Sequence, residues 1–427
     1  MIARSMLALA LASTLATSAF AATGVTTATD LGSLKLYSTA DDAALLTGVQ
    51  LFVRAGLDRE TDKQNGLAAL SAESLLQTPI DGVPLRAAIA AHGGSISYVV
   101  GLQDIRFYLE AAPDMLPTFA GQLASAIAGH ALVPATIAAA QRALYMRIAD
   151  DERNPVTVGL AMLRQSYFVG NTGAPLFGIP ATLAILSSDD VNAFIAAHYR
   201  RGNATVTAAG RVTDDVRTAA KTLASGLPEG SEASLPAAVH AFGATPKRIV
   251  TQRDIGVPYV VLGFAAPAVG DKDFGAMLIL RSLLSDAFDR TSSVTFPAFS
   301  RAVGVIYNYE SKPAMLSMYI NGAQLDPSTG LQTVDTAVHA VAATPLQAAL
   351  LKRYKSSARG EWATESVSLA DRSWLIGTFV EQGASPDYAQ SVFAAIDATS
   401  GKDVQRVAQA YLQRFTVALV LPRASKT

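Results

Sequence analysis

Two halves of the sequence repeat the same order of expected elements, and this repeat limits what the chain can fold into. Each half contains an alternating apolar strand, a charged turn, an apolar helix and a glycine-led hairpin. The strand, helix and hairpin lie at 49–53, 67–76 and 93–109 in the first half, and at 257–264, 277–284 and 304–320 in the second. The repeat predicts two domains of similar build.

The rest of each half follows the same plan. An amphipathic helix comes next in both, and each half ends with a short helix and an apolar strand. These segments are 115–127, 190–199 and 204–208 in the first half, and 330–341, 403–411 and 416–420 in the second. Hairpins with alternating faces indicate antiparallel sheet, and amphipathic helices indicate that one face is covered. We therefore expect an α+β fold of two homologous domains, each an antiparallel β-sheet covered by α-helices.

A stretch rich in Pro, Gly and Ser separates the two halves. Residues 226–246 show neither a helical nor a strand period, which is typical of a linker. We therefore place the first domain at 22–225 and the second at 247–427.

The N-terminus has the pattern of a secretory signal. Arg4 supplies the positive start, 6–16 is a short apolar run, and Ala19-Phe20-Ala21 is a small-x-small cleavage site. The run is shorter than the roughly 20 residues that span a bilayer, and no later stretch is long and charge-free enough. The sequence thus predicts a signal peptide at 1–21, an exported protein (periplasmic or secreted), and no membrane span.

Composition removes several classes of function. Lys and Arg number 34 against 35 Asp and Glu, so no net field attracts nucleic acid. The chain has no cysteine, which excludes thiolate metal sites and cysteine nucleophiles. It also lacks a Gly-x-Ser-x-Gly elbow, a Walker-type phosphate loop and a Gly-x-Gly-x-x-Gly turn after a strand.

Three segments carry a family resemblance. The stretch 198–210, His-Tyr-Arg-Arg-Gly-Asn followed by an apolar strand and Gly, resembles a His-Tyr-x-Pro-x-Asn pattern, with Arg201 where Pro is usual. The loop 175–180 resembles a Tyr-Gly-x-Pro loop, and Gly93-Gly94 opens a matching hairpin. In this order, the chain resembles the pitrilysin/insulinase-type zinc metallopeptidases, a group that includes the mitochondrial processing peptidases. The resemblance implies a processing-peptidase-like fold.

The resemblance also places a metal site, and here the chain departs from the family. Active relatives bind zinc through a His-x-x-Glu-His helix and a distal Glu, and the motif Glu polarises the attacking water. The matching positions are Ala69, Ala72, Glu73 and Arg147. Two methyls, one carboxylate and one cation do not replace two imidazoles and a carboxylate ligand. We therefore expect no zinc, no other cofactor and no catalytic residue.

Two alternatives remain open at this metal position. Shifting the alignment by one residue places Glu73 on the catalytic Glu but recovers no histidine. A site built from remote histidines would have to draw on five widely separated residues, His92, His130, His198, His240 and His339. We expect Glu73 and Arg147 to form a pair that fills the emptied site, or to face solvent.

Four residues are candidates for substrate binding by resemblance. In active relatives the edge strand of the hairpin pairs with the peptide, and Ser97-Tyr98 stands where Asn-Ala is usual. Tyr98 either reshapes that groove or packs as a strand aromatic. Relatives also aim an Arg-x6-Tyr pair from the second half at the substrate carbonyl. Tyr307 fits the Tyr, whereas Arg301 lies one residue beyond the Arg position; the alternative is a core tyrosine and a surface arginine.

The resemblance suggests a function without catalysis. Two-domain members of the family act as dimers, and one subunit of a heterodimer can lack the metal site. The leading hypothesis is a zinc-free subunit of an exported insulinase-type peptidase, with a zinc-binding paralogue as partner, that supplies substrate-binding chamber and specificity. A stand-alone or homodimeric peptide-binding scaffold is the second hypothesis. An active metallopeptidase with a non-standard metal site is the third.

Overall fold

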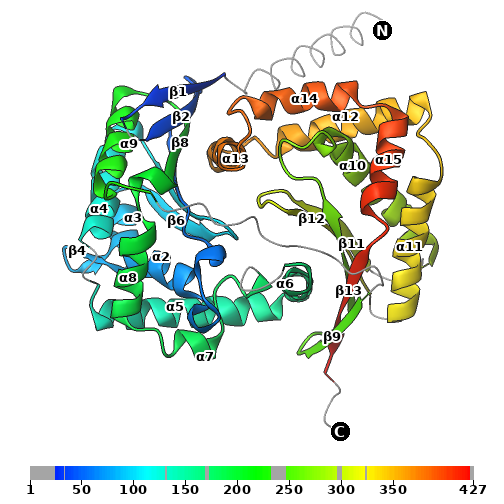
Figure 1. Ribbon diagram of the computed structural model, residues 1–427, viewed down its shortest axis with the longest axis horizontal. Helices are drawn as coiled ribbons and strands as arrows, with labels where there is room; N and C mark the ends of the chain where they lie inside the picture. Colours follow the sequence, from blue (N-terminus) through cyan, green and yellow to red (C-terminus); the bar gives the residue numbers. More distant parts are fainter. Residues whose placement is uncertain are drawn as a thin grey trace, which may run out of the picture.

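Two β-sheets, one from each half of the chain, form the frame of the protein (Figure 1). The computed structural model describes residues 25–32, 34–129, 132–168, 173–231, 247–295, 301–322 and 325–423. The expected signal peptide and positions 232–246 of the expected linker lie outside these residues.

The first half contains eight strands, eight α-helices and four 3-10 turns that the structure describes. In chain order they are β1 (Thr26–Asp30), β2 (Lys35–Ala40), β3 (Thr47–Val53), η2 (Leu57–Arg59), η3 (Asp62–Gln64), α2 (Leu67–Gln77), β4 (Pro79–Ile80), β5 (Val83–Pro84), α3 (Leu85–Ala91), β6 (Ser95–Val100), β7 (Ile105–Ala111), η4 (Pro113–Met115), α4 (Leu116–Ala128), α5 (Pro134–Arg153), α6 (Pro155–Tyr167), α7 (Pro180–Leu183), α8 (Ser188–His198), η6 (Arg201–Asn203), β8 (Ala204–Gly210) and α9 (Asp214–Gly226).

The described part of the second half begins at Lys247 and has fewer strands. Its elements are β9 (Lys247–Arg253), β10 (Tyr259–Ala266), α10 (Phe274–Thr295), β11 (Arg301–Asn308), β12 (Ala314–Gly322), α11 (Pro327–Ala343), α12 (Ala348–Thr364), α13 (Leu369–Glu381), α14 (Tyr388–Ala398), α15 (Gly401–Tyr411) and β13 (Phe415–Pro422).

The sheets confirm the predicted α+β class and add one detail. The first sheet has the order β1-β2-β8-β3-β7-β6 and the second β11-β12-β10-β13-β9. Neighbouring strands are antiparallel except for one pair in each sheet, β2 with β8 and β13 with β9. The exception arises because the last strand of each half, β8 or β13, inserts beside an early strand of the same half, β2 or β9, and runs in the same direction.

The repeat seen in the sequence extends to the helix caps. The helix that precedes the last strand, α8 or α15, starts with the same Ser-x-x-Asp capping box in both halves. Ser187 Oγ accepts from the Asp190 amide at 3.3 Å, and Ser400 Oγ accepts from the Asp403 amide at 3.2 Å. Each box satisfies backbone donors that a helix start leaves free.

One helix from each half packs on the sheet of the other half. Helix α6 contacts β10 and β13, and α13 contacts β3 and β8; both lie between the two lobes in Figure 1. A glycine in each allows close approach. A Cβ at Gly377 would lie 2.1 Å from the Phe52 ring, and one at Gly159 would lie 2.5 Å from Val261. Helices α6 and α13 therefore each belong to one half in sequence but pack on the sheet of the other half.

Polar contacts hold these exchanged helices in place. Gln50 Nε2 donates to Ser373 Oγ at 3.0 Å, and Thr207 Oγ1 donates to the Ser373 carbonyl at 2.8 Å. On the other side, the Tyr167 hydroxyl donates to the Ala314 carbonyl at 3.2 Å. The halves are thus joined by paired polar groups as well as by apolar packing.

Most apolar side chains lie in two large cores, one for each half. Val261, Met315 and Ala418 belong to the core of the first half although they come from the second. Helix α6 packs on β10 and β13, which carry Val261 and Ala418. In the described part of the chain, no single helix is long and apolar enough to cross a membrane. The adjacent helices α11 and α12, bent by 120°, meet that length and composition criterion only as a pair.

Candidate functional site

Helix α2 carries three of the four positions at which the family resemblance places a metal site. A buried carboxylate fixes its N-terminus, because Glu60 accepts from the amides of Gly66 at 3.1 Å and Ala68 at 2.8 Å. Burial raises the pKa of Glu60 to about 7. Gly66 lies in the left-handed region at φ 95°, where only Gly fits easily, and a Cβ there would meet Gly178 at 2.8 Å. The 175–180 loop therefore packs directly on the start of α2.

The methyl groups of Ala69 and Ala72 lie in the core of the first half and are fully buried. Glu73, which follows them, is 4% exposed. A carboxylate so deeply buried needs polar partners. It finds them on two neighbouring elements and on its own helix.

Three side chains surround the Glu73 carboxylate. Arg86 Nη2 on α3 donates at 3.1 Å, and Gln77 Nε2 donates at 2.7 Å. The Tyr98 hydroxyl on β6 also hydrogen-bonds to Glu73. Burial, together with the Glu73 charge, raises the pKa of Tyr98 far above its usual range. We call Glu73, Gln77, Arg86 and Tyr98 the Glu73 cluster.

Arg147 does not join the Glu73 cluster as an ion-pair partner. Its side chain is 61% exposed, and Nε lies 3.6 Å from Asp151 Oδ1 one turn along α5. The guanidinium stacks over the Phe177 ring at 4.7 Å from the centroid. The expected Glu73–Arg147 pair is therefore wrong. Arg86 is the ion-pair partner of Glu73 instead, because α3 follows α2 closely and brings the Arg86 side chain to the Glu73 carboxylate.

The hairpin strand β6 is the outer strand of its sheet in the described residues. It pairs with β7, and Ser97 lies opposite Tyr108. Ile96 and Val100 face inward, and Tyr98 shares their face because side chains alternate along a strand. Tyr98 therefore points toward α2, whereas Ser97 is exposed. This orientation agrees with the alternative in which Tyr98 packs as a strand aromatic.

A cavity of about 630 Å³ is lined by residues of both halves. Its walls come from the end of β6, the C-terminal turn of α5, α6, the 175–180 loop, β9 and the β11–β12 hairpin. Arg106, at 5% exposure, crosses part of it and binds Glu310 of the other half at 3.0 Å. Its size falls in the range of roughly 300–1,000 Å³ typical of ligand sites.

Comparisons with known proteins agree with this geometry. Residues 186–357 match the family model described as the Peptidase M16 inactive domain. The alpha subunit of the mitochondrial-processing peptidase from Solanum tuberosum is 22% identical over 380 residues, which cover 84% of this chain and 75% of that protein. The resemblance of this chain to the pitrilysin/insulinase-type (M16) peptidases is thereby confirmed.

Solved structures show the same M16 fold at low identity. A protease from Helicobacter pylori has a TM-score of 0.82 at 14% identity, over 94% of this chain and 100% of that one. The peptidase M16 inactive domain from Pseudomonas fluorescens gives 0.80 at 14% identity, over 94% and 98%. A chain of complex III2 from Candida albicans gives 0.79 at 14% identity, over 92% and 95%.

The zinc of active M16 peptidases does not fit the residues of this chain. The methyl groups of Ala69 and Ala72 have no atom that could coordinate a metal, and the Glu73 carboxylate is already paired with Arg86. In the described residues, no three His, Cys, Asp or Glu side chains come together in a way that could hold a metal. His92, His198 and His339 lie on separate elements, and His130 and His240 fall outside the described residues. At these positions the chain thus lacks the zinc ligands of the active peptidases that it resembles.

The hydroxyl of Tyr307, the tyrosine of the second-half pair, is engaged within the second half. Tyr307 is 6% exposed, and its hydroxyl donates to the Pro267 carbonyl inside the second half. Its ring packs on Phe274 at 5.6 Å. The expected role in holding a substrate carbonyl needs a free hydroxyl, so the core-tyrosine alternative fits the structure. Arg301 begins β11 opposite Gly322, and its side chain is outside the described set.

Sequence reasoning missed the polar residues that line the cavity. Arg164 on α6 and Arg253 on β9 both face it, but they are far apart in sequence and belong to different halves. A signal for Arg164 was present, since it is the single charge in the apolar helix 155–167. No signal in the sequence indicated that this helix crosses to the other sheet.

Proposed function

We propose that this chain is a non-catalytic, peptide-binding M16 subunit. One observation carries the proposal: the frame for holding a peptide is kept while the metal position is filled. The outer strand β6 borders the cavity at Val100, and the Glu73 cluster occupies the position where active relatives carry zinc ligands. A chain that retains the first feature and has lost the second is suited to binding without cleavage.

The edge of β6 supports binding of an extended peptide. An outer strand presents backbone donors and acceptors that a further strand can pair with. Ser97 and Val99 are exposed on one face of β6, so no bulky wall stands over this part of the strand. A peptide that continues past Val100 would reach the cavity between the halves.

The partner in this proposal is a zinc-binding paralogue, in an exported heterodimer. The match to a protein named as the alpha subunit of a processing peptidase supports a subunit role. The chain of complex III2 that shares this fold is a second example from a named complex, and it also supports a subunit role. In such a pair this chain would supply one wall of the chamber and part of its specificity.

Co-expression with a paralogue from the same genome that carries His-x-x-Glu-His tests the proposal. We expect the purified chain alone to contain no stoichiometric zinc and to leave casein and fluorogenic peptides uncut. With the paralogue, we expect co-purification and an increase in peptide cleavage over the paralogue alone. About one zinc per chain by elemental analysis, with chelator-sensitive cleavage by the chain alone, would instead establish the active-peptidase hypothesis.

A stand-alone peptide-binding protein is the second candidate. It is favoured because the cavity lies between two halves of one chain, so no partner is needed to close it. A stable monomer or homodimer that ignores the paralogue but binds extended peptides would select this candidate. Blocking the β6 edge by Val100→Pro should weaken binding in both cases, because alternation from Gly101, whose amide donates to Asp104, turns the Val100 amide away from β7, and proline removes that donor.

A further inference from the structure

The cavity between the halves contains two arginines whose charge is not matched by a carboxylate within the described chain. Arg164 Nη2 reaches only the Ala174 carbonyl, at 3.4 Å, and its Nε has no hydrogen-bond partner. Arg253 Nη1 binds Thr251 Oγ1 at 2.6 Å, and its Nε likewise has none. Both side chains are half-buried and line the same cavity.

Other largely buried arginines of the described chain are paired. Arg281 binds Glu365 at 2.6 Å and Glu361 at 3.0 Å. Arg372 binds Asp41 at 3.0 Å. A guanidinium removed from water without an anion is unfavourable, and burial lowers the pKa of Arg164 to about 10. Arg164 and Arg253 therefore differ from the structural arginines of this protein.

The charges of Glu310 and Asp151 act on Arg164, but within the described chain neither carboxylate forms an ion pair with Arg164 or Arg253, because each is engaged by another arginine. Asp151 is engaged by Arg147 at 3.6 Å, and Glu310 by Arg106 at 3.0 Å. Glu152, the third acidic side chain of the lining, is exposed at the end of α5. Two guanidiniums remain available to an anion that enters the cavity.

We propose that Arg164 and Arg253 form a carboxylate-binding subsite in this cavity, and that its ligand is a carboxylate carried by a short peptide. Guanidinium groups bind carboxylates through two parallel hydrogen bonds, so one carboxylate can pair with two N–H donors of either arginine. The peptide part of the proposal rests on the proposed function; the carboxylate part rests on the two arginines alone.

Fluorescence anisotropy with three labelled probes tests the subsite in the mature chain. The probes are a fluorescein-tagged Gly-Ala-Gly-Ala-Ala with a free C-terminus, its C-terminal amide, and an amidated version that ends in Glu. We expect the free carboxylate to bind about tenfold to a hundredfold more tightly than the amide. Binding of the Glu probe at the higher affinity would identify side-chain recognition; its absence would identify the peptide terminus.

Two variants and a control test whether the preference for the acid probe over the amide probe comes from the two cavity arginines. Arg164→Gln and Arg253→Gln should each remove most of the difference between acid and amide probes. Arg153→Gln should preserve it, because Arg153 is 76% exposed and pairs with Asp150 outside the cavity. Equal affinity for acid and amide in the wild type, or a difference that survives in both cavity variants, would overturn the proposal.

A second measurement separates this proposal from the proposed function. Succinate should raise the melting temperature of the wild type and of Arg153→Gln, but not of Arg164→Gln. If no peptide binds and succinate still stabilises in this pattern, the subsite stands and the peptide-binding function fails. If neither peptide nor succinate distinguishes the wild type from Arg164→Gln, the subsite fails as well.

Discussion

Equivalent places in the two halves hold polar clusters with opposite arrangements of charge. In the first half, the carboxylate of Glu73 is buried at 5% side-chain exposure and its cation, Arg86, is 45% exposed. In the second half, the cation Arg281 is 10% exposed, and its carboxylates Glu361 and Glu365 are 39% and 29% exposed. The corresponding helices, α2 and α10, thus carry the buried charge in both halves, but its sign is reversed.

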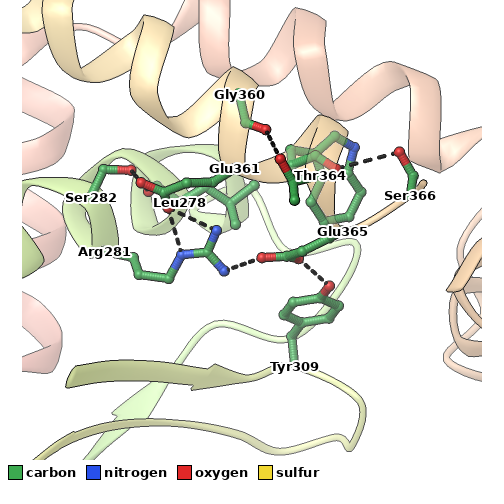
Figure 2. A network of polar contacts seen from close by, with 10 residues as sticks. Leu278, Arg281, Ser282, Tyr309, Gly360, Glu361, Thr364, Glu365 and Ser366 are labelled. Carbon is green, nitrogen blue, oxygen red and sulfur yellow. Dashed lines mark hydrogen bonds and ion pairs between the residues drawn. The ribbon is translucent and has the colours of Figure 1, made fainter. Parts of the chain in front are cut away.

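Figure 2 shows how completely the second cluster is satisfied. Arg281 lies between two glutamates of the α12 segment, Ser282 donates to Glu361 at 2.7 Å, and the Tyr309 hydroxyl donates to Glu365 at 2.6 Å. Tyr98 makes the equivalent tyrosine–glutamate contact in the first half. One cluster is thus an internal structural network, whereas the other fills the position where the family resemblance places a metal site and remains close to solvent.

Removing Arg281 should have the largest effect. Arg281→Met leaves two glutamates next to each other without their cation, and we expect unfolding free energy to fall by about 3 kcal/mol. Urea unfolding followed by circular dichroism measures the change. Arg217→Met is the control: its partner Asp214 is 98% exposed, so the change should stay within about 0.5 kcal/mol. Equal losses in the two variants would contradict a structural role for the second cluster.

The starts of the two equivalent helices should respond differently to pH. The pKa of Glu60, at the start of α2, is raised to about 7 from an ordinary value near 4.5. A raised pKa means that the folded state binds the Glu60 proton more tightly than the unfolded state does. The contribution of this proton to the unfolding free energy is therefore complete below pH 4.5 and is lost as pH rises through 7. The expected loss is about 3 kcal/mol over that window.

Glu60→Gln should remove this part of the pH dependence. Asp104 is another buried carboxyl with a raised pKa, and it is present in both proteins. The difference in unfolding free energy between wild type and variant at each pH therefore reports Glu60 alone. At the start of α10, Asp273 is bound by Arg406 at 2.7 Å. Asp273→Asn is therefore the matched comparison. If the unfolding free energies of wild type and Glu60→Gln change in parallel from pH 4.5 to 7, the pH dependence does not come from Glu60.

The two tyrosines allow the same substitution in both clusters. Tyr309→Phe removes a hydrogen bond to a charged group in a packed aromatic region, and we expect a loss of about 2 kcal/mol. Tyr98→Phe should cost about 1 kcal/mol, since Glu73 keeps Arg86 and Gln77. Thermal and urea unfolding measure both. A larger loss for Tyr98 would reverse the proposed ranking of the two clusters.

Arg86→Gln should have the smallest effect. Its side chain is 45% exposed, so water and the shorter amide can replace much of what the guanidinium supplies. We expect a loss below about 1 kcal/mol. A loss as large as that of Arg281→Met would show that the Glu73 cluster is as essential to the fold as its counterpart.

Sequence reasoning predicted the elements whose signal is local. Helix 67–76 became α2, Leu67–Gln77, and the hairpin became β6 and β7, since their apolar periodicity sets which face is buried. The orientation of Tyr98 could also have been predicted, because Ile96 and Val100 alternate with it on one buried face. The α+β class and the similar build of the two halves followed from the order of such elements, whereas the family resemblance came from the residues of the segments 198–210, 175–180 and 93–108.

The remaining features depend on contacts that local sequence does not encode. Amphipathicity shows that α6 and α13 bury a face, but not on which sheet. The partner of Glu73 was missed because Arg86 lies 13 residues away, beyond the β4–β5 turn, and no helical spacing joins them. Arg164 and Arg253 line the same cavity although they come from different halves, and α6, which carries Arg164, packs on the sheet of the other half. The linker, the export signal and the partner stay predictions.

The exchanged helices also determine how quickly a ligand can come and go. Moving the lobes apart would strip α6 from β10 and β13 and α13 from β3 and β8 at the same time. Such an opening is comparable to sub-global unfolding and correspondingly rare. The residence time of a bound peptide should then follow local motion of the 175–180 loop, which lines the cavity and needs no change in either sheet.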